Sequence, residues 1–323
     1  MHCSNNFKQW GLALHAYHDA VQAFPASISN TYSDTRKNAD GTAVDTDCWS
    51  ASFKLLPYME QQSRYAAIVS RVPWVWEGNS IPEMAGKIPP LLCPSDGSSQ
   101  SPGLNSGCRS SIVVSCGDGM DSNRANPRDL VAPWEGCNIT NHGFFVPYVY
   151  KSMASITDGT SNTVAASETV SNPLTANGYR GIKGGVYPVR PASASDCNIT
   201  ARSTTARNEL AADSSGSYRG HWFTDGRPVT GQFNTIMPPN GPCCSDGAGD
   251  GGWALVAASS NHSGGVNVLR GDASVTFVSE TIGTKLNGND TAAVPTQTPS
   301  GRSPYGIWGE LGTPNGGEAT PFP

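Results

Sequence analysis

The sequence is poor in charged residues. Only 15% of its 323 residues are Asp, Glu, Lys or Arg, against about a quarter in ordinary soluble domains. No cluster of Lys and Arg occurs, and the formal net charge is −5. Because nucleic-acid binding requires a clustered basic face, these features argue against DNA or RNA as a partner.

Several chemical motifs are also missing. The chain has no window of 18 apolar residues, no signal peptide and no repeat period of 20 to 50 residues, which argues against a membrane span and against a solenoid. It contains no Gly-x-Ser-x-Gly, no phosphate loop and no Cys-x-x-Cys. The sequence therefore offers no hydrolase elbow, no nucleotide-binding loop and no finger-like zinc spacing.

Glycine, proline and cysteine are plentiful instead. With 36 Gly and 24 Pro, short strands joined by turns and long loops are favoured. The nine cysteines suit disulfides in an oxidising, extracytoplasmic compartment, so we expect most of them to be oxidised. Nine is odd, so at least one thiol is free or pairs between chains. Adjacent Cys243 and Cys244 are expected to bond to different partners, and Cys108 and Cys116 could staple the short run between them.

Residues 1–25 predict a helix. Large apolar residues recur at steps of three or four and form one stripe, namely Phe7, Trp10, Leu14, Tyr17 and Val21. The opposite positions are small or polar, namely Ser4, Lys8, Gly11, His15 and Asp19. Pro25 closes the helix. The helix either begins within the given chain or continues from a segment upstream of it.

A hairpin is the clearest β prediction. Val266, Val268 and then Val275, Phe277 alternate on either side of residues 270–273. This turn also explains the integrin-like tripeptide Arg270-Gly271-Asp272. Other predicted elements are a helix over 49–65 interrupted at Pro57, strands over 110–115, 143–150 and 182–189, and a turn followed by a strand over 153–168. Residues 284–323 are expected to form an extended tail, anchored by Tyr305, Ile307, Trp308 and Leu311.

His262 opens the hairpin and has two interpretations. It could serve as the base of a catalytic triad, or it could tie a strand end to a neighbouring loop by hydrogen bonds. No serine stands out as a nucleophile, so we favour the structural interpretation and expect no catalytic residue.

Four acidic loops could hold Ca²⁺, which prefers six to eight oxygen ligands. They contain Asp40, Asp45 and Asp47; Asp118, Asp121 and Asn123; Asp158 and Asn162; and Asp246 to Asp250. Asp and Asn are also ordinary turn residues, and the turn interpretation is favoured for each loop. No cofactor besides this calcium is expected. The eight tryptophans could stack on sugars, although core packing is the simpler explanation.

Five blocks of sequence appear in an order typical of one family. They are residues 3–19 with Phe24-Pro25; residues 55–62; Cys93-Pro94-Ser95-Asp96; residues 156–163 with Glu168; and His262 followed after nine residues by Asp272, with Ala273 in place of a glycine. This pattern resembles the DUF1559 family of pilin- or pseudopilin-like proteins. Its motif residues here are Cys3, Cys93, Asp96, His262 and Asp272.

The resemblance implies an α+β fold, in which an N-terminal pilin-like helix packs on an antiparallel sheet with long inserted loops. We therefore divide the chain into a helix (1–25), a β-rich head (26–283) and a tail (284–323). Family members begin with a prepilin leader and an apolar helix, so Met1 is expected to match an internal family position, after processing or truncation.

The implied function is structural. The chain would be a non-catalytic subunit of an extracellular or cell-surface filament of identical copies, in contact with a membrane only through an upstream helix. The alternative is a secreted, calcium-dependent glycan-binding module.

Overall fold

The computed structural model describes residues 2–29, 48–71, 75–77, 81–119, 142–173, 179–189, 191, 193–206, 208–212, 218–245, 254–286, 301–318 and 320–323. Its centre is a five-stranded sheet in the order β5-β3-β4-β8-β9. The strands are β3 (Ile112–Ser115), β4 (Val164–Glu168), β5 (Gln232–Phe233), β8 (Gly265–Arg270) and β9 (Val275–Ser279). All neighbours pair antiparallel except β3 and β5, which are parallel. The predicted α+β class is confirmed.

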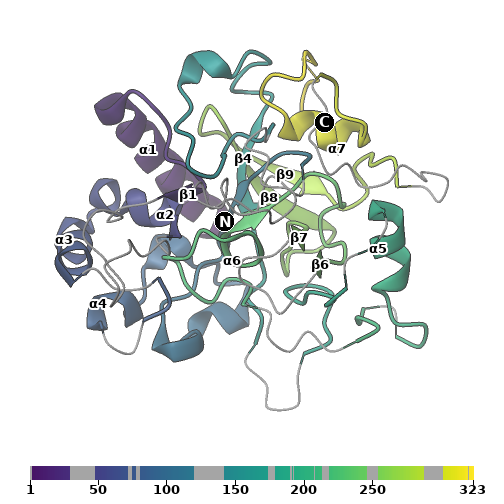
Figure 1. Cartoon of the computed structure of the whole chain (residues 1–323), viewed down its shortest axis with the longest axis horizontal. Coiled ribbons are helices and arrows are strands. Elements are labelled where there is room, and N and C mark those ends of the chain that lie inside the picture. Colours follow the sequence, from purple (N-terminus) through teal and green to yellow (C-terminus); the bar gives the residue numbers. More distant parts are fainter. Residues whose placement is uncertain are drawn as a thin grey trace, which may run out of the picture.

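Short elements surround this sheet (Figure 1). The helices are α1 (His2–Val21), α2 (Ala51–Lys54), α3 (Gln62–Arg71), α4 (Pro82–Ala85), α5 (Ala194–Thr200), α6 (Pro228–Gly231) and α7 (Gly306–Gly312). The 3₁₀ turns are η1 (Leu56–Met59), η2 (Pro89–Leu91), η3 (Gly97–Gln100), η4 (Leu104–Ser106) and η7 (Met153–Ser155). Two small ribbons pair β1 (Ile28–Ser29) with β2 (Trp49–Ser50), and β6 (Cys244–Ser245) with β7 (Ala254–Leu255). Among the described residues, no helix has the length and apolar character needed to cross a membrane.

Helix α1 lies on one face of the sheet, against β8 and β9. The predicted stripe is buried from Phe7 to Tyr17, which confirms most of it. Val21 is 48% exposed, so its place in the stripe was wrong; it is the last residue of the helix. Gly11 was also misplaced on the polar side. A Cβ there would lie 2.9 Å from Leu269 Cδ1, so glycine lets the helix approach the β8–β9 hairpin closely.

Strands β3 and β4 are buried on both faces of the sheet. Ile112 and Val114 belong to the core beneath α1, whereas Val113 belongs to a second core with Trp308 and Leu311 of α7. This division follows from the alternation of side chains along a strand. The predicted extended tail was therefore wrong in part. Residues 306–312 form a helix, and of its expected anchors only Ile307 is exposed, at 43%.

Three other element predictions change. Residues 49–65 form β2, α2, η1 and the first part of α3 in place of one helix, and Pro57 lies in the 3₁₀ turn between the two helices. Residues 143–150 form no strand and contribute only a bridge between Val146 and Val149. Tyr148 between them has a φ of 60°, which breaks an extended backbone. Residues 182–189 contribute only a bridge from Tyr187 to Cys244.

The hairpin is confirmed, with β8 and β9 in register from Gly265 opposite Ser279 to Leu269 opposite Val275. Ala273, where the family pattern has glycine, has a φ of 64°, in the region that glycine adopts most easily. Asp272 Oδ1 accepts a hydrogen bond from Ser274 N at 2.9 Å. Gly271 N and Asp272 N donate to the carbonyls of Thr163 and Thr160. The Arg-Gly-Asp tripeptide thus forms a turn packed against a neighbouring loop.

Two disulfides join described residues: Cys3 to Cys93 and Cys197 to Cys244. Cys108 and Cys243 are buried free thiols, so the suggested bridge from Cys108 to Cys116 does not form. Cys243 and Cys244 were expected to form disulfides with different partners. This is wrong for Cys243, and only Cys244 forms a disulfide. Burial raises the pKa of the Cys108 thiol to about 11, which makes its reactive thiolate scarce. Four of the eight cysteines among the described residues are thus joined in disulfides, and Cys137 lies outside those residues.

The burial of the α1 stripe predicts its contribution to stability. We expect Trp10→Ala and Leu14→Ala each to lower the free energy of unfolding by roughly 2–5 kcal/mol, because both side chains are fully buried and would leave cavities. Leu12→Ala is the matched control on the same helix, since Leu12 is 68% exposed; its effect should stay within about 0.5 kcal/mol. Denaturant unfolding measures all three, and equal midpoints for Leu14→Ala and Leu12→Ala would contradict the packing of α1 on the sheet.

Candidate functional site at the start of helix α1

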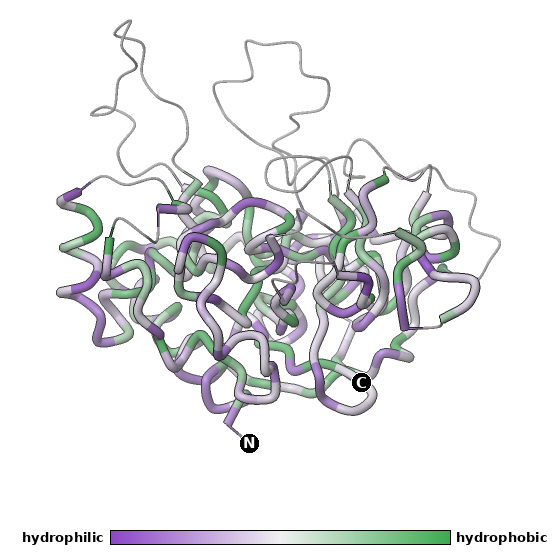
Figure 2. Tube along the Cα trace, turned by 90° about the horizontal axis from the view of Figure 1, so that it is seen from below, coloured by the Kyte–Doolittle hydropathy of each residue, from purple (hydrophilic) through white to green (hydrophobic). Residues whose placement is uncertain are grey.

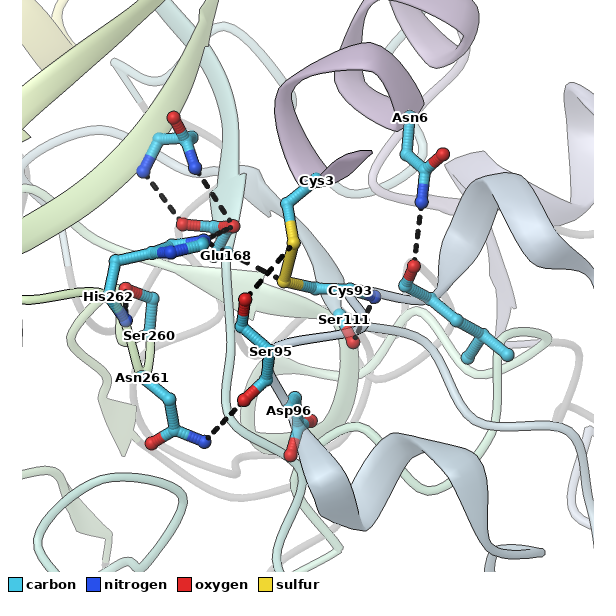
Figure 3. Close-up of a disulfide and its surroundings, with 12 residues drawn as sticks. Cys3, Asn6, Cys93, Ser95, Asp96, Ser111, Glu168, Ser260, Asn261 and His262 are labelled. Atoms are coloured by element: carbon cyan, nitrogen blue, oxygen red, sulfur yellow. Dashed lines mark hydrogen bonds and ion pairs between the residues drawn. A yellow bond between two sulfur atoms is a disulfide. The ribbon is translucent and has the colours of Figure 1, made fainter. Parts of the chain in front are cut away.

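Four side chains from four separate segments meet where α1 begins (Figure 3). Cys3 lies in the first turn of α1, Cys93 between η2 and η3, Glu168 at the end of β4, and His262 before β8. One sulfur, nitrogen or oxygen atom from each lies within 4.8 Å of the others. We call these four residues the helix-start junction.

The disulfide joins α1 to the segment after η2. Asn6 supports this contact, because its Nδ2 donates to Leu92 O at 2.7 Å. On the other side, Cys93 N donates to Ser111 Oγ at 3.0 Å. The first turn of α1 is thereby held to the head by a covalent bond and by hydrogen bonds to the same segment.

Glu168 is the buried charge of the junction, with 1% of the residue exposed. Asn267 donates twice to its carboxylate, from N to Oε2 at 2.7 Å and from Nδ2 to Oε1 at 3.1 Å. His262 Nε2 lies 3.0 Å from Oε1. Burying a carboxylate is costly unless it is paired and hydrogen-bonded, and these three contacts meet that requirement.

His262 connects the junction to open space. Its backbone N donates to Ser260 Oγ at 3.1 Å, and its Nε2 lies 3.7 Å from Cys93 Sγ as well as close to Glu168. The same residue lines a cavity of about 750 Å³, together with Lys183, Asn240 and Glu280 among others. His262 therefore belongs both to the junction and to the lining of this cavity.

The junction has the carboxylate–imidazole pair of a triad without its nucleophile. In a triad, a hydroxyl or thiol bonds to the ring nitrogen opposite the carboxylate. Among the described residues, no hydroxyl hydrogen-bonds to the His262 ring, and the sulfur beside it is held in a disulfide. The arrangement instead ties the segment before β8 to β4, as expected for a bracing histidine.

The other two motif residues lie apart from the junction atoms. Asp96 caps η3 by accepting from Ser98 N and also accepts from Ser171 N at 2.9 Å. Burial raises the pKa of this carboxyl, against the opposing effect of the Ser171 hydrogen bonds. Asp272 lies beyond the far end of β8 from His262, in the hairpin turn. The spacing of nine residues therefore places the two signature residues at opposite ends of one strand.

The calcium candidates have mixed outcomes. Asp158 accepts from Gly317 N at 3.1 Å, and Asn162 Nδ2 donates to Asp158 O at 3.0 Å, so this loop is a turn that holds the C-terminal segment. Both oxygens of buried Asp118 have no hydrogen-bond partner, and His142 Nδ1 is 3.9 Å away. The remaining calcium candidates lie outside the described residues, namely Asp40, Asp45, Asp47, Asp121, Asn123 and residues 246–250.

The tryptophans among the described residues are buried or partly buried, which favours packing over sugar stacking. Trp10, Trp49, Trp222 and Trp308 are buried. Trp76 is partly buried, with the Arg227 guanidinium 5.0 Å from its ring centroid. Trp74, Trp134 and Trp253 lie outside the described residues.

A helix that packs on a largely antiparallel sheet, and whose first turn is bonded to the segment after η2, defines an α+β protein with a covalently anchored N-terminal helix. A family model described as a protein of unknown function, DUF1559, matches residues 1–285. The chain belongs to this family, as the five sequence blocks predicted. No curated protein and no solved structure matches the chain.

All four residues of the junction lie in the family blocks of the sequence, but the sequence did not predict that they are in contact. Cys3, Cys93 and His262 were named as motif residues, and Glu168 closed one of the family blocks. The cysteine spacing indicated no metal, because the chain has no Cys-x-x-Cys and no Cys and His quartet with finger-like spacing. No rule of local spacing predicts a contact between four positions that lie so far apart in the sequence. Only their shared occurrence in the family pattern could have indicated it.

The hydrogen bonds of Glu168 predict a role for His262 in stability. We expect His262→Ala to lower the free energy of unfolding by roughly 1–3 kcal/mol, because it removes one partner of a buried carboxylate while the Asn267 bonds remain. His2→Ala is the control, since His2 is exposed on the same α1 end and should change stability by less than about 0.5 kcal/mol. Thermal and denaturant unfolding measure both, and equal stabilities would refute the bracing role.

Asp118 predicts a pH dependence. Burial raises the pKa of its carboxyl to about 6, whereas an unfolded Asp titrates near about 4. Stability from the neutral acid is therefore fully present below about pH 4 and is lost as the pH rises through about 6. Asp118→Asn keeps this group neutral, so its gain in melting temperature over the parent should grow from pH 4 to pH 7.

Asp19→Asn is the control for this pH series, because Asp19 is exposed on α1. Its melting curve should follow that of the parent at every pH. A difference between Asp118→Asn and the parent that stays constant from pH 4 to pH 7 would show that Asp118 does not titrate in this range.

Proposed function

We propose that this chain is a non-catalytic structural subunit of an extracellular, pilus- or pseudopilus-like filament. The observation that carries the proposal is the attachment of α1. One stripe of the helix is buried on the sheet, and its first turn is bonded to the head through Cys3 and Cys93. A subunit held in a filament by its helix needs such an attachment between helix and head.

The position of the N-terminus supports this proposal. Figure 2 places the N end at the outer edge of the chain trace. An apolar helix joined in front of α1 could therefore leave the head without disturbing its core. Such helices would bundle as the centre of a filament, because about 20 exposed apolar residues are strongly disfavoured in water.

The junction suggests how the head would resist a pull on that helix. A force on α1 would pass through Cys3 to the segment that contains Cys93. The Cys93 sulfur lies beside His262, and His262 in turn contacts Glu168 of β4. Strand β4 is the middle strand of the sheet, fully buried and paired on both sides. A load on α1 would thus pass into the most strongly held part of the head.

The two disulfides fit an exported protein, because such bonds persist in oxidising compartments. In this proposal the partners are identical copies, and contact with a membrane occurs only through a helix upstream of α1. The polar groups of the junction hold elements together, which supports a role without catalysis.

Adding an apolar helix tests the proposal. We would fuse about 20 apolar, helix-forming residues in front of His2, in phase with α1. We expect this form to sediment as ordered filaments by electron microscopy, while the parent chain stays dispersed. The matched control carries a fusion of equal length with charged residues on every turn, and it should also stay dispersed. Amorphous aggregate or a dispersed monomer from the apolar form would contradict the filament function.

A further inference from the structure

The helix-start junction gathers four side chains of the kinds that bind metal ions, two of them joined in a disulfide. Two sulfurs, an imidazole nitrogen and a carboxylate oxygen converge within 4.8 Å (Figure 3). This donor set combines soft thiolates with nitrogen and oxygen, which suits Zn²⁺ among the common divalent ions. Within the described residues, no other group of at least three His, Cys, Asp or Glu side chains converges in this way.

The distances agree with such a site. Zn–S bonds of about 2.3 Å and Zn–N or Zn–O bonds of about 2.0–2.2 Å place neighbouring ligand atoms about 3.3–3.8 Å apart in a tetrahedron. His262 Nε2 is 3.7 Å from Cys93 Sγ and 3.0 Å from Glu168 Oε1. Two edges of the tetrahedron are therefore almost in place. The edge between the sulfurs requires that their covalent bond be broken, so that rotation about each Cα–Cβ bond can separate them.

The surroundings already orient the ligands. Asn267 donates to both oxygens of Glu168, from N to Oε2 at 2.7 Å and from Nδ2 to Oε1 at 3.1 Å, which holds the carboxylate with Oε1 3.0 Å from His262 Nε2. The Ser260 hydroxyl holds the backbone of His262. Outer-shell hydrogen bonds of this kind fix ligand orientation in metal sites. His262 also lines the 750 Å³ cavity, which gives an ion or a small reductant a route to the junction.

We propose that the reduced protein binds one Zn²⁺ at Cys3, Cys93, Glu168 and His262, and that this ion holds α1 on the head as the disulfide does in the oxidised protein. The reductant is a dithiol. Its two thiols become a disulfide and give two electrons and two protons, which convert the bond between Cys3 and Cys93 into two thiols. On binding Zn²⁺, these thiols release their protons to solvent, and the neutral imidazole binds through Nε2 with its proton on Nδ1.

Cobalt is the probe for this site, because Co²⁺ takes the same tetrahedral geometry and is coloured. The full chain is reduced, the reductant is removed under anaerobic conditions, and the protein is then titrated with Co²⁺. We expect one ion per chain, with tetrahedral ligand-field bands and thiolate-to-cobalt charge transfer, and we expect Zn²⁺ to displace it. The oxidised protein should show neither band. Zn²⁺ should raise the melting temperature of the reduced protein only.

Variants separate this site from the other thiols. Cys197→Ser with Cys244→Ser removes the second disulfide, which lies outside the junction, and should keep the cobalt spectrum. Cys3→Ser with Cys93→Ser should abolish the charge-transfer band. His262→Ala should weaken cobalt binding by at least the roughly 10–100-fold typical of losing an outer-shell partner.

Three results would overturn the proposal. The first is a reduced and folded chain, judged by circular dichroism, that shows no thiolate charge transfer. The second is a reduced chain that stays unfolded with Zn²⁺ present. The third is undiminished cobalt affinity in His262→Ala, or in the double serine variant of Cys3 and Cys93. None of these results bears on filament formation, which is tested with the oxidised chain.

Discussion

The structure depends on one buried carboxylate. Glu168 ends the middle strand of the sheet with almost no exposure, and an unpaired charge at this depth would cost several kcal/mol. Its partners are therefore constrained in position. Asn267 must lie in β8 beside it, and His262 must turn in from the preceding segment. Once these are placed, the Cys93 sulfur lies beside the imidazole, and Cys3 and α1 follow through the disulfide.

The two faces of the sheet are covered by helices from opposite ends of the chain. On one face, α1 is held at its start by the junction and packs its stripe down to the hairpin, where Gly11 permits close contact. On the other face, α7 supplies Trp308 and Leu311. The turn that contains Asp158 then holds the C-terminal segment through Gly317. Both ends of the described chain thus belong to the core around the same strands.

The same junction supports two distinct proposals. As a mechanical connection, it attaches the N-terminal helix to the centre of the head, which suits a filament subunit. As a chemical site, it holds the donor atoms for Zn²⁺ once the sulfurs are reduced. Both rest on the same geometry, but one uses the covalent bond and the other requires its absence. The oxidation state of Cys3 and Cys93 therefore decides whether a covalent bond or, in our proposal, a metal ion holds α1 on the head.

The sequence by itself determined the local and patterned features. Apolar spacing predicted α1 and most of its buried stripe, alternation around a turn predicted the β8–β9 hairpin, and the ordered blocks predicted the family. Tertiary structure decided the rest. Pairing of Cys3 with Cys93, and their meeting with Glu168 and His262, joins residue 3 to residue 262. No local period or propensity encodes contacts between such distant segments, because they arise only when strand register and burial of a shared core bring the segments together.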